Sequence, residues 1–338
     1  MPITSATVGG IAVVIPSYNR KHLILGSLES VVNQTLPPDR VILVDDGSSD
    51  GTQQVVEEWQ RSQDLAFELR YIYQSNSGPG AARNRGIQEA DGCNWVALLD
   101  SDDLWHPEHL ARLVEAIADH PDAIAASNEL EERFYAEDGT LLSSRPFLYS
   151  PELISGQIVG PEAFRFIGPL TQATMIRRDA LVKAGGFDNR LKYAEDKLLF
   201  IIVSTMGPWC RVPGYPVIYR NFVRNTKAPQ TGAKQLSDRP HQNSRLAYAR
   251  LLSEGIGHLA KSNAPYHQGV DWALWKAWYR AGRHLEMTGH YKWAAGYYRK
   301  AARYRPFSKA IARCYLARLK YLWSRLGGQS QRGRQAIQ

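Results

Sequence analysis

Three carboxylates stand within four positions at the end of an apolar run, in the segment LLDSDDLW (98–105). Asp100 and Asp102 are two residues apart, so in an extended segment their side chains point the same way. Carboxylates this close repel one another and resist ionising together, and a hard divalent cation such as Mg²⁺ or Mn²⁺ would relieve that repulsion. The alternative is structural, because Asp102 or Asp103 could cap the helix expected to begin near Pro107.

Asp45 and Asp46 form a second acidic pair, in the segment VDDGSSDGT (44–52). Asp50 or Ser49 is expected to cap the helix that follows, so the adjacent pair exceeds what capping needs. A carboxylate at this point could accept a hydrogen bond from a nucleotide base or from a ribose.

The glycine-rich segment NSGPGAARNRG (76–86) has some features of a dinucleotide-binding loop, because Gly78 and Gly80 follow a strand-like run and open a helix. The third glycine position of that loop holds Arg83, and the segment follows the third expected strand instead of the first. Both differences argue against a dehydrogenase. Arg83 and Arg85 could instead meet phosphates, or they could form a solvated basic helix face.

These motifs fall between alternating strand-like and helix-like segments. Short apolar runs predict strands at 11–16, 40–46, 69–74, 95–100 and 122–127. Helical patterns lie between them at 20–34, 50–61, 81–90 and 106–120. The alternation predicts βαβ units in an α/β fold with a mostly parallel central sheet. Because ligands bind beyond the carboxyl ends of the strands in such sheets, the polar residues after the first, second and fourth strands are expected to converge.

Five segments in order resemble a family 2 glycosyltransferase of the GT-A (nucleotide-diphospho-sugar transferase) fold: VVIPSYNR, VDDGSSDGT, NSGPGAARNRG, LLDSDDLWHP and GGFDNRLKYAEDKLLF. The resemblance extends over residues 10–225 or so. It implies an inverting, metal-dependent enzyme, with Mg²⁺ or Mn²⁺ as the cofactor. The expected donor is a nucleotide-diphosphate sugar, a UDP-sugar by preference, and the expected acceptor is a hydroxyl of a saccharide or of a lipid-linked molecule.

The resemblance also assigns expected roles in donor binding, residue by residue. Pro16 and Tyr18 match the first motif, in which the aromatic ring packs on the donor base. Asp46 matches the residue that accepts a hydrogen bond from the base imide, and Asp45 lies beside it. Arg83 matches a basic position near the donor.

Asp100 and Asp102 match the DxD pair of the family, which binds both donor and metal. Asp102 is expected to ligate the metal, and Asp100 to contact the ribose or a metal-bound water. Glu195 and Asp196 match an ED motif in which the aspartate is the general base that takes the proton of the acceptor hydroxyl. The structural alternative for this pair is a helix start with acids in its first turn.

The chain departs from the family pattern after residues 219–220, where a histidine often follows a Tyr-Arg pair. Asn221 and Phe222 stand there instead. Arg220 or Arg224 could then help to hold the pyrophosphate, and the third contact to the metal is left open.

Charge divides the chain into two parts. Residues 1–239 carry 23 Lys and Arg against 30 Asp and Glu, whereas residues 240–338 carry 18 against three. Helical patterns in the second part lie at 244–260, at 271–306 with a tetratricopeptide-like hairpin turning at Thr288-Gly289, and at 307–326. The expected domains are a catalytic domain over 1–235, a basic helical region over 236–326 and a disordered tail over 327–338.

The composition narrows the classes of partner. Basic amphipathic helices with Trp and Tyr on one face commonly lie on anionic lipid, so an anionic membrane surface is expected to bind the C-terminal helices, with packing on the catalytic domain as the alternative. A nucleic-acid partner is not expected, because the first part is acidic and no nucleic-acid-binding motif is present. Three isolated cysteines, no signal-peptide pattern and no long apolar run indicate a cytoplasmic protein, either free or peripheral on the cytoplasmic face of the membrane. The alternative function is a non-catalytic protein of the GT-A fold that binds partners through its helical C-terminal region.

Overall fold

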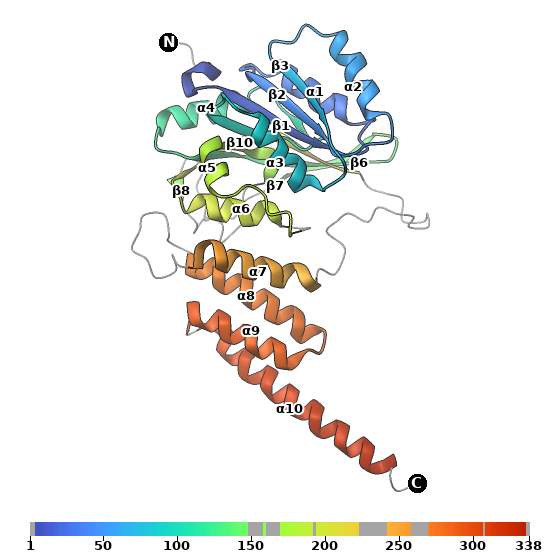
Figure 1. The fold of residues 1–338 in the computed structure, drawn as a ribbon, viewed down its shortest axis with the longest axis vertical. Helices are drawn as coiled ribbons and strands as arrows, with labels where there is room; N and C mark the ends of the chain where they lie inside the picture. The colour runs from blue at the N-terminus through green and yellow to red at the C-terminus, as the bar shows by residue number, and fades with distance from the viewer. Residues whose placement is uncertain are drawn as a thin grey trace. The chain divides into compact units, whose positions relative to one another are not determined.

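The computed structural model of the chain describes residues 4–147, 158–159, 170–191, 194–222, 242–257, 270–306 and 308–335. Two compact units can be distinguished, Met1–Lys234 and Gln235–Gln338. Figure 1 colours the first from blue to yellow-green and the second from orange to red.

Unit 1 is built around one mixed sheet, with strands β1 (Ile11–Ser17), β2 (Arg40–Asp45), β3 (Glu68–Tyr73), β4 (Trp95–Leu98), β5 (Leu104–Trp105), β6 (Ala125–Tyr135), β7 (Leu141–Phe147), β8 (Ile158–Val159), β9 (Thr174–Arg177) and β10 (Trp209–Phe222). Its helices are α1 (Ile24–Val32), α2 (Thr52–Arg61), α3 (Pro79–Glu89), α4 (His109–Asp119), α5 (Arg178–Lys183) and α6 (Glu195–Ser204), with 3-10 turns at Ser5–Val8 and Thr171–Ala173.

The strand order is β3-β2-β1-β4-β9-β6-β10-β5, with β7 paired to β6 and β8 paired to β10. The first four strands are parallel, as the βαβ alternation predicts. β9 runs antiparallel to both of its neighbours, β4 and β6, so β6 and β10 again have the direction of the first four strands. The prediction of an α/β fold with a mostly parallel sheet is confirmed, and the helical C-terminal region that follows it is confirmed as well.

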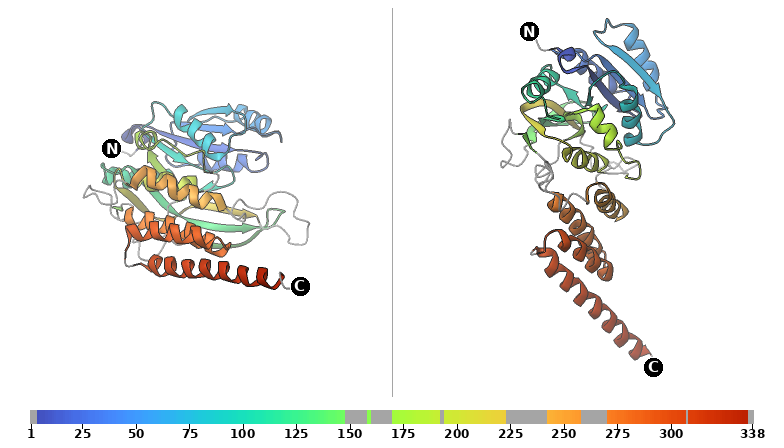
Figure 2. Two further views of the ribbon diagram at one scale, coloured as in Figure 1. Left: turned by 60° about the horizontal axis from the view of Figure 1, so that its bottom comes forward. Right: turned by 60° about the vertical axis from the view of Figure 1, so that its left-hand side comes forward.

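Helices cover both faces of the sheet (Figures 1 and 2). Alternate residues of β1, among them Val13 and Ile15, share one buried cluster with side chains of α1, α2 and α4. Val14 points to the other face, where α3 comes so close that a Cβ added to Gly86 would lie 2.3 Å from Val14 Cγ1. Only glycine fits this crossing, so the glycine of the ARNRG segment sets how tightly α3 packs on the sheet.

Unit 2 consists of the helices α7 (Gln242–Ile256), α8 (Val270–Met287), α9 (Tyr291–Tyr304) and α10 (Lys309–Gln335). Neighbours in sequence pack side by side (Figures 1 and 2). The chain turns between α8 and α9 at Gly289, whose φ of +78° is one that glycine adopts readily. None of the helices in the described parts of the chain is long and apolar enough to cross a membrane.

α10 is helical as far as Gln335, and it therefore covers most of the segment for which the sequence predicts disorder. The physical reason is that extending an existing helix adds one hydrogen bond for each residue that is ordered, which offsets the low helix propensity of Gly327, Gly328 and Gly333.

Candidate functional site

The segments that follow β1, β2 and β4 leave the sheet at one edge. Pro16 in β1 pairs with Val44 in β2, and Ser17 pairs with Asp45. β4 lies on the other side of β1 and ends at Leu98, two residues before Asp100. At this edge Pro16 is buried and the Tyr18 side chain is half exposed, which leaves its ring free to meet a ligand.

Asp45 is buried and already accepts two hydrogen bonds from the chain. The Ser48 N–H donates to Asp45 Oδ1 at 2.8 Å, and the Tyr71 hydroxyl donates to Oδ2. Burial and this hydrogen bond raise the pKa of Tyr71, so the tyrosine stays protonated and remains a donor. Each carboxylate oxygen can accept two hydrogen bonds, so one place is left on each oxygen of Asp45.

Asp46 ties the turn after β2 to the loop that precedes α3. Its Oδ1 accepts from Gln74 Nε2 at 2.7 Å and from the Ser77 N–H at 2.9 Å, and its Oδ2 accepts from the Gly78 N–H at 2.7 Å. The carboxylate is buried. Its scaffold role is therefore established by these contacts, and one acceptor place remains on Oδ2 for a ligand.

Arg83 joins the DxD segment to the ED segment. This buried side chain donates from Nη2 to Asp100 Oδ1 at 2.6 Å and from Nη1 to Glu195 Oε1 at 3.3 Å. Its guanidinium carbon lies 5.3 Å from the centre of the Phe187 ring. Burial, together with the charge of Asp196, raises the pKa of Glu195, although Arg83 opposes that change. Arg83 thus brings together two acidic motifs that are far apart in the sequence.

Asn84 is a contributor that the sequence analysis missed. Its Oδ1 accepts the Phe187 N–H and its Nδ2 donates to the Phe187 carbonyl, each at 2.8 Å. This pair of bonds holds the GGFD segment against α3, the helix that carries Arg83. The signal in the sequence was an asparagine between two arginines of one motif.

Asp196 lies in the first turn of α6, directly after the residue that contacts Arg83. Its side chain is half-buried, and Oδ1 accepts the N–H of Lys197 at 2.7 Å. Ala194, which precedes the helix, has a φ of +60°, a left-handed conformation that is uncommon for a residue with a side chain. Such outliers are found most often at functional sites, which fits the placing of this turn beside the DxD segment.

Asp102 accepts a hydrogen bond from Arg20, whose Nη2 lies 3.1 Å from Asp102 Oδ2. Burial and the nearby charge of Asp100 raise the pKa of Asp102. The sequence analysis did not single out Arg20, although it is the last residue of the first motif, VVIPSYNR.

The idea that Asp103 caps the helix near Pro107 is wrong. α4 begins at His109, and its N-cap position, Glu108, makes no side-chain capping bond. The fully buried Asp103 instead accepts the Arg220 N–H at 2.9 Å. Burial, followed by repulsion from Asp102, raises the pKa of Asp103 well above its usual range.

Arg220 is engaged with the chain, because its Nε donates to the backbone carbonyl of Asp102. The same contact fixes the backbone of the DxD segment against β10. Arg224, the other basic residue considered for the pyrophosphate, lies outside the described residues.

Asp100 and Asp102 fit a divalent cation that arrives together with phosphate groups. Mg²⁺ is usually bound through one or two carboxylates and completes its shell with waters and substrate phosphates. Within the described residues, no three or more His, Cys, Asp and Glu side chains are grouped so as to hold a metal on their own. Burial, and after it repulsion from Asp100, raises the pKa of Asp102, and a cation would relieve the repulsion.

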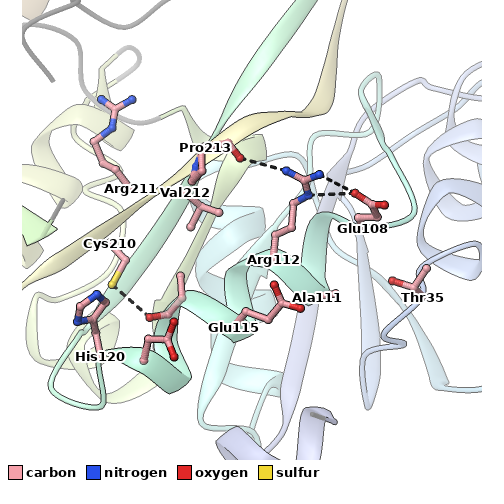
Figure 3. Close-up of a pocket in the computed structure, with 12 residues that line it drawn as sticks. Thr35, Glu108, Ala111, Arg112, Glu115, His120, Cys210, Arg211, Val212 and Pro213 are labelled. Atoms are coloured by element: carbon pink, nitrogen blue, oxygen red, sulfur yellow. Dashed lines mark hydrogen bonds and ion pairs between the residues drawn. The ribbon is translucent and has the colours of Figure 1, made fainter. Parts of the chain in front are cut away.

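A separate pocket of about 680 Å³ lies between α4 and β10 (Figure 3). Charges of both signs line it, and Arg112 pairs there with Glu108 at 2.7 Å. None of the residues singled out in the sequence lines this pocket. The candidate site is instead the edge of the sheet at which Asp102 pairs with Arg20.

Comparison with known proteins agrees with the sheet and its motifs. Residues 12–147 match the family model described as Glycosyl transferase family 2. The chain is similar to the putative teichuronic acid biosynthesis glycosyltransferase TuaG of Bacillus subtilis (strain 168), with 32% identity over 145 residues, which are 43% of this chain and 54% of that protein. It is also similar to the succinoglycan biosynthesis protein ExoO of Rhizobium meliloti (strain 1021), with 30% identity over 217 residues, 61% of this chain and 59% of that protein. In three curated relatives, TuaG among them, the matched part of this chain covers 54%, 26% and 34% of the relative's length, so it spans only part of each protein.

Solved structures share the fold at low identity. The crystal structure of S. aureus TarS 1-349 matches with a TM-score of 0.66 and 20% identity, over 92% of this chain and 87% of that chain. The structure of TarS 1-349 in complex with UDP-GlcNAc matches with a TM-score of 0.64 and 20% identity, over 92% of this chain and 88% of that chain. At this level of identity the likeness shows the GT-A fold alone.

Proposed function

Residues 12–147 place this chain in glycosyl transferase family 2, and from that premise we propose that it transfers a sugar from a nucleotide-diphosphate donor to a hydroxyl group with inversion. The observation that carries the proposal is the buried Arg83 bridge, which holds Asp100 and Glu195 in one site. The DxD segment, which is proposed to bind the donor, then lies beside the ED segment, which carries the proposed base. Direct attack of the acceptor on the donor in one step requires these two groups to be close together.

The donor diphosphate is proposed to lie at the DxD segment. A bound Mg²⁺ or Mn²⁺ would supply Lewis-acid stabilisation of the negative charge on the leaving diphosphate. Asp102 is the proposed ligand of this cation, and Asp100 is proposed to contact the donor ribose or a metal-bound water. Arg83 neutralises Asp100 from the protein side and fixes its orientation through the 2.6 Å hydrogen bond.

The donor base is proposed to bind between the first two motifs. Tyr18 is half exposed and offers a ring face for stacking, while Pro16 holds the start of that loop in β1. Asp45 and Asp46 keep acceptor places free beside it, and Asp46 is proposed to accept from the base. A UDP-sugar is the proposed donor, in keeping with the TarS 1-349 structure that is titled as a complex with UDP-GlcNAc.

Asp196 is the proposed general base. In an inverting transfer the acceptor oxygen forms a bond to the anomeric carbon while the bond from that carbon to the diphosphate oxygen breaks. Asp196 takes the proton of the acceptor hydroxyl, and the diphosphate leaves with the electron pair. The proposed acceptor is a saccharide or lipid-linked hydroxyl, which fits relatives named for teichuronic acid and succinoglycan biosynthesis. The proposed location is the cytoplasm or the cytoplasmic face of a membrane.

The proposal is tested by thermal shift of the full chain with UDP-, GDP- and dTDP-sugars, each with Mn²⁺ and with EDTA. One nucleotide sugar should raise the Tm, and the rise should require Mn²⁺. Hydrolysis or transfer of that sugar should then be detected by release of the nucleoside diphosphate. An equal shift with Mn²⁺ and with EDTA would remove the metal from the proposal.

A matched pair of variants tests the metal ligand. Asp102→Asn should abolish the dependence of donor binding on Mn²⁺. Asp103→Asn should preserve this dependence, because the amide oxygen can still accept the Arg220 N–H. If both variants lose the dependence equally, the DxD segment is disturbed as a whole and Asp102 has no special role.

A further inference from the structure

α10 packs on its neighbour with its small residues and leaves its large apolar residues outside. Ala310, Cys314 and Ala317 are buried, and Cys314 and Ala317 form a cluster with residues of α9. In contrast, Ile311, Tyr315, Leu316, Leu319 and Leu322 are between 38% and 63% exposed. A helix in a water-soluble protein normally buries its large apolar residues, so this outward face needs a partner.

The exposed residues form one continuous stripe. Positions 311, 315, 319 and 322 are separated by four, four and three residues, which is the spacing of one face of an α-helix. Leu316 widens the stripe on one side. We call these five residues the outer stripe of α10, and its extent exceeds that of a single exposed leucine, which would need no explanation.

The charge around the outer stripe has one sign. α9 and α10 contain no acidic residue. In the parts of these two helices whose side chains the structure describes, the exposed basic residues are Lys292, Arg299, Lys300, Arg303, Lys309, Arg318 and Lys320. Glu286 at the end of α8 is buried, and it already binds Arg313 at 3.0 Å and Lys320 at 2.8 Å. The two helices that carry and support the stripe therefore have a net positive charge, and Arg318 lies beside Leu319 in the sequence of the stripe.

An exposed apolar stripe on a basic pair of helices favours one kind of binding partner. A second copy of the chain, docked stripe to stripe, would bring two positively charged surfaces together, and like charges at an interface oppose association. A bilayer that contains anionic lipid offers apolar chains for the stripe and negative headgroups for the surrounding lysines and arginines at the same time. We propose that the outer stripe of α10 is a membrane-docking surface that lies in the headgroup region of an anionic bilayer.

The proposal goes beyond the sugar transfer and does not rest on it. It is tested by co-sedimentation of the full chain with phosphatidylcholine vesicles in which about one third of the lipid is phosphatidylglycerol, since such headgroups attract basic segments. The full chain should pellet with these vesicles at low salt and should be released as salt is raised. It should bind pure phosphatidylcholine vesicles much more weakly.

The stripe itself is tested with Leu319→Ser combined with Leu322→Ser. Because both side chains are exposed, the variant should keep the circular-dichroism spectrum and the Tm of the wild type. Its partition onto anionic vesicles should weaken by about tenfold or more, since two leucines would no longer enter the bilayer. The matched control is Leu141→Ser combined with Leu142→Ser, which removes two exposed leucines from β7 and should leave partition unchanged.

Charge is tested separately with Arg318→Gln and its control Arg61→Gln, which removes the same charge from an exposed position in α2. Only the first should weaken binding to anionic vesicles.

Two results with vesicles would overturn the proposal. One is that the leucine variant binds as well as the wild type, and the other is that the wild-type chain stays in the supernatant at low salt. A concentration-dependent dimer without vesicles that the leucine variant loses would also overturn it, because the stripe would then be covered by a second copy. The Tm rise caused by the nucleotide sugar should be the same in all these variants, so failure of membrane binding is distinguishable from failure of the proposed sugar transfer.

Discussion

At the residue scale, the structure shows Arg83 bound to carboxylates, whereas its positive charge in a glycine-rich loop suggested a phosphate contact. A basic residue in a glycine-rich loop suggests contact with a phosphate, yet this side chain is buried between Asp100 and Glu195. A guanidinium can bind two carboxylates at once through separate nitrogens. Arg83 can therefore hold two segments of the site in register whether or not it also touches the donor.

Replacement of Arg83 is expected to destabilise the chain. Arg83→Met leaves two partly buried carboxylates, Asp100 and Glu195, without their buried partner. The loss should approach the ~3–5 kcal/mol that is typical when one partner of a fully buried ion pair is removed. The control is Arg85→Met, because Arg85 is exposed and its pair with Glu89 one helical turn away is of the kind worth about 0–1 kcal/mol. Urea unfolding of both variants measures the difference, and equal losses would contradict the bridging role.

Asp196 is expected to act in the chemical step alone. Asp196→Asn should lower kcat by at least ~10²-fold, the usual size of a general-base contribution, while the Tm rise with donor is retained. Asp179→Asn, at an exposed acid in α5, should leave kcat near that of the wild type. A variant at Asp196 with near-normal turnover would assign the proton transfer to another group.

At the scale of elements, the crossing of α3 over β1 positions the site. α3 carries Arg83 and Asn84 on the same helix as Gly86, so the depth at which this helix lies sets where both polar side chains reach. The close approach to Val14 leaves no room for a methyl group. The packing of one glycine is thus linked to the geometry of the acidic cluster.

Gly86→Ala should destabilise unit 1 by about 1–3 kcal/mol, because the new methyl group overpacks a buried crossing. Gly26→Ala in α1 is the matched control, since an added Cβ there would meet its nearest atoms at an ordinary 3.5 Å. Alanine has the higher helix propensity, so this control should be neutral or stabilising by up to about 1 kcal/mol. Urea unfolding should therefore show a loss of stability in Gly86→Ala and no loss in Gly26→Ala, and a neutral Gly86→Ala would contradict the close packing.

At the scale of the whole molecule, acids around the candidate site of unit 1 have raised pKa values, whereas the buried acid of unit 2 has a lowered pKa. Unit 1 gathers carboxylates at one edge of its sheet, where several are raised in pKa. Unit 2 keeps one buried acid, Glu286, inside a basic surrounding. Burial raises the pKa of Glu286, but hydrogen bonds from Lys320, Tyr298 and Arg313 outweigh that effect and lower the pKa to about 2.

The stability of unit 2 should therefore depend on pH in a defined window. The pKa of Glu286 is lower in the folded chain than its usual value of 4.5, so its stabilising contribution is complete above about pH 4.5 and is lost as the pH falls towards 2. Hydrogen-exchange protection factors of α8–α10 should fall over this window in the wild type. In Glu286→Gln they should be lower at neutral pH and should change less with acid. Identical pH profiles for the two chains would contradict this account.

The sequence by itself determined the local elements and the places of the motifs. The expected helix at 81–90 is α3 at Pro79–Glu89, and the expected strand at 40–46 is β2 at Arg40–Asp45. Apolar periodicity, Gly and Pro act within a few residues of themselves, which is why they could be read without the fold. The placing of acids after parallel strands was predictable for the same reason, because the rule needs only the order of the elements.

Only the tertiary structure decided which of these groups meet. The antiparallel entry of β9, the bond from the Arg220 N–H to Asp103 and the bridge from Arg83 to Glu195 each join segments far apart in the sequence. The outward apolar face of α10 is a further case, because the amphipathic pattern shows that a stripe exists but not which side of the helix packs on α9. Local periodicity is set by backbone geometry, whereas these pairings are set by the simultaneous packing of the whole unit, and that packing has no signature in any short stretch of sequence.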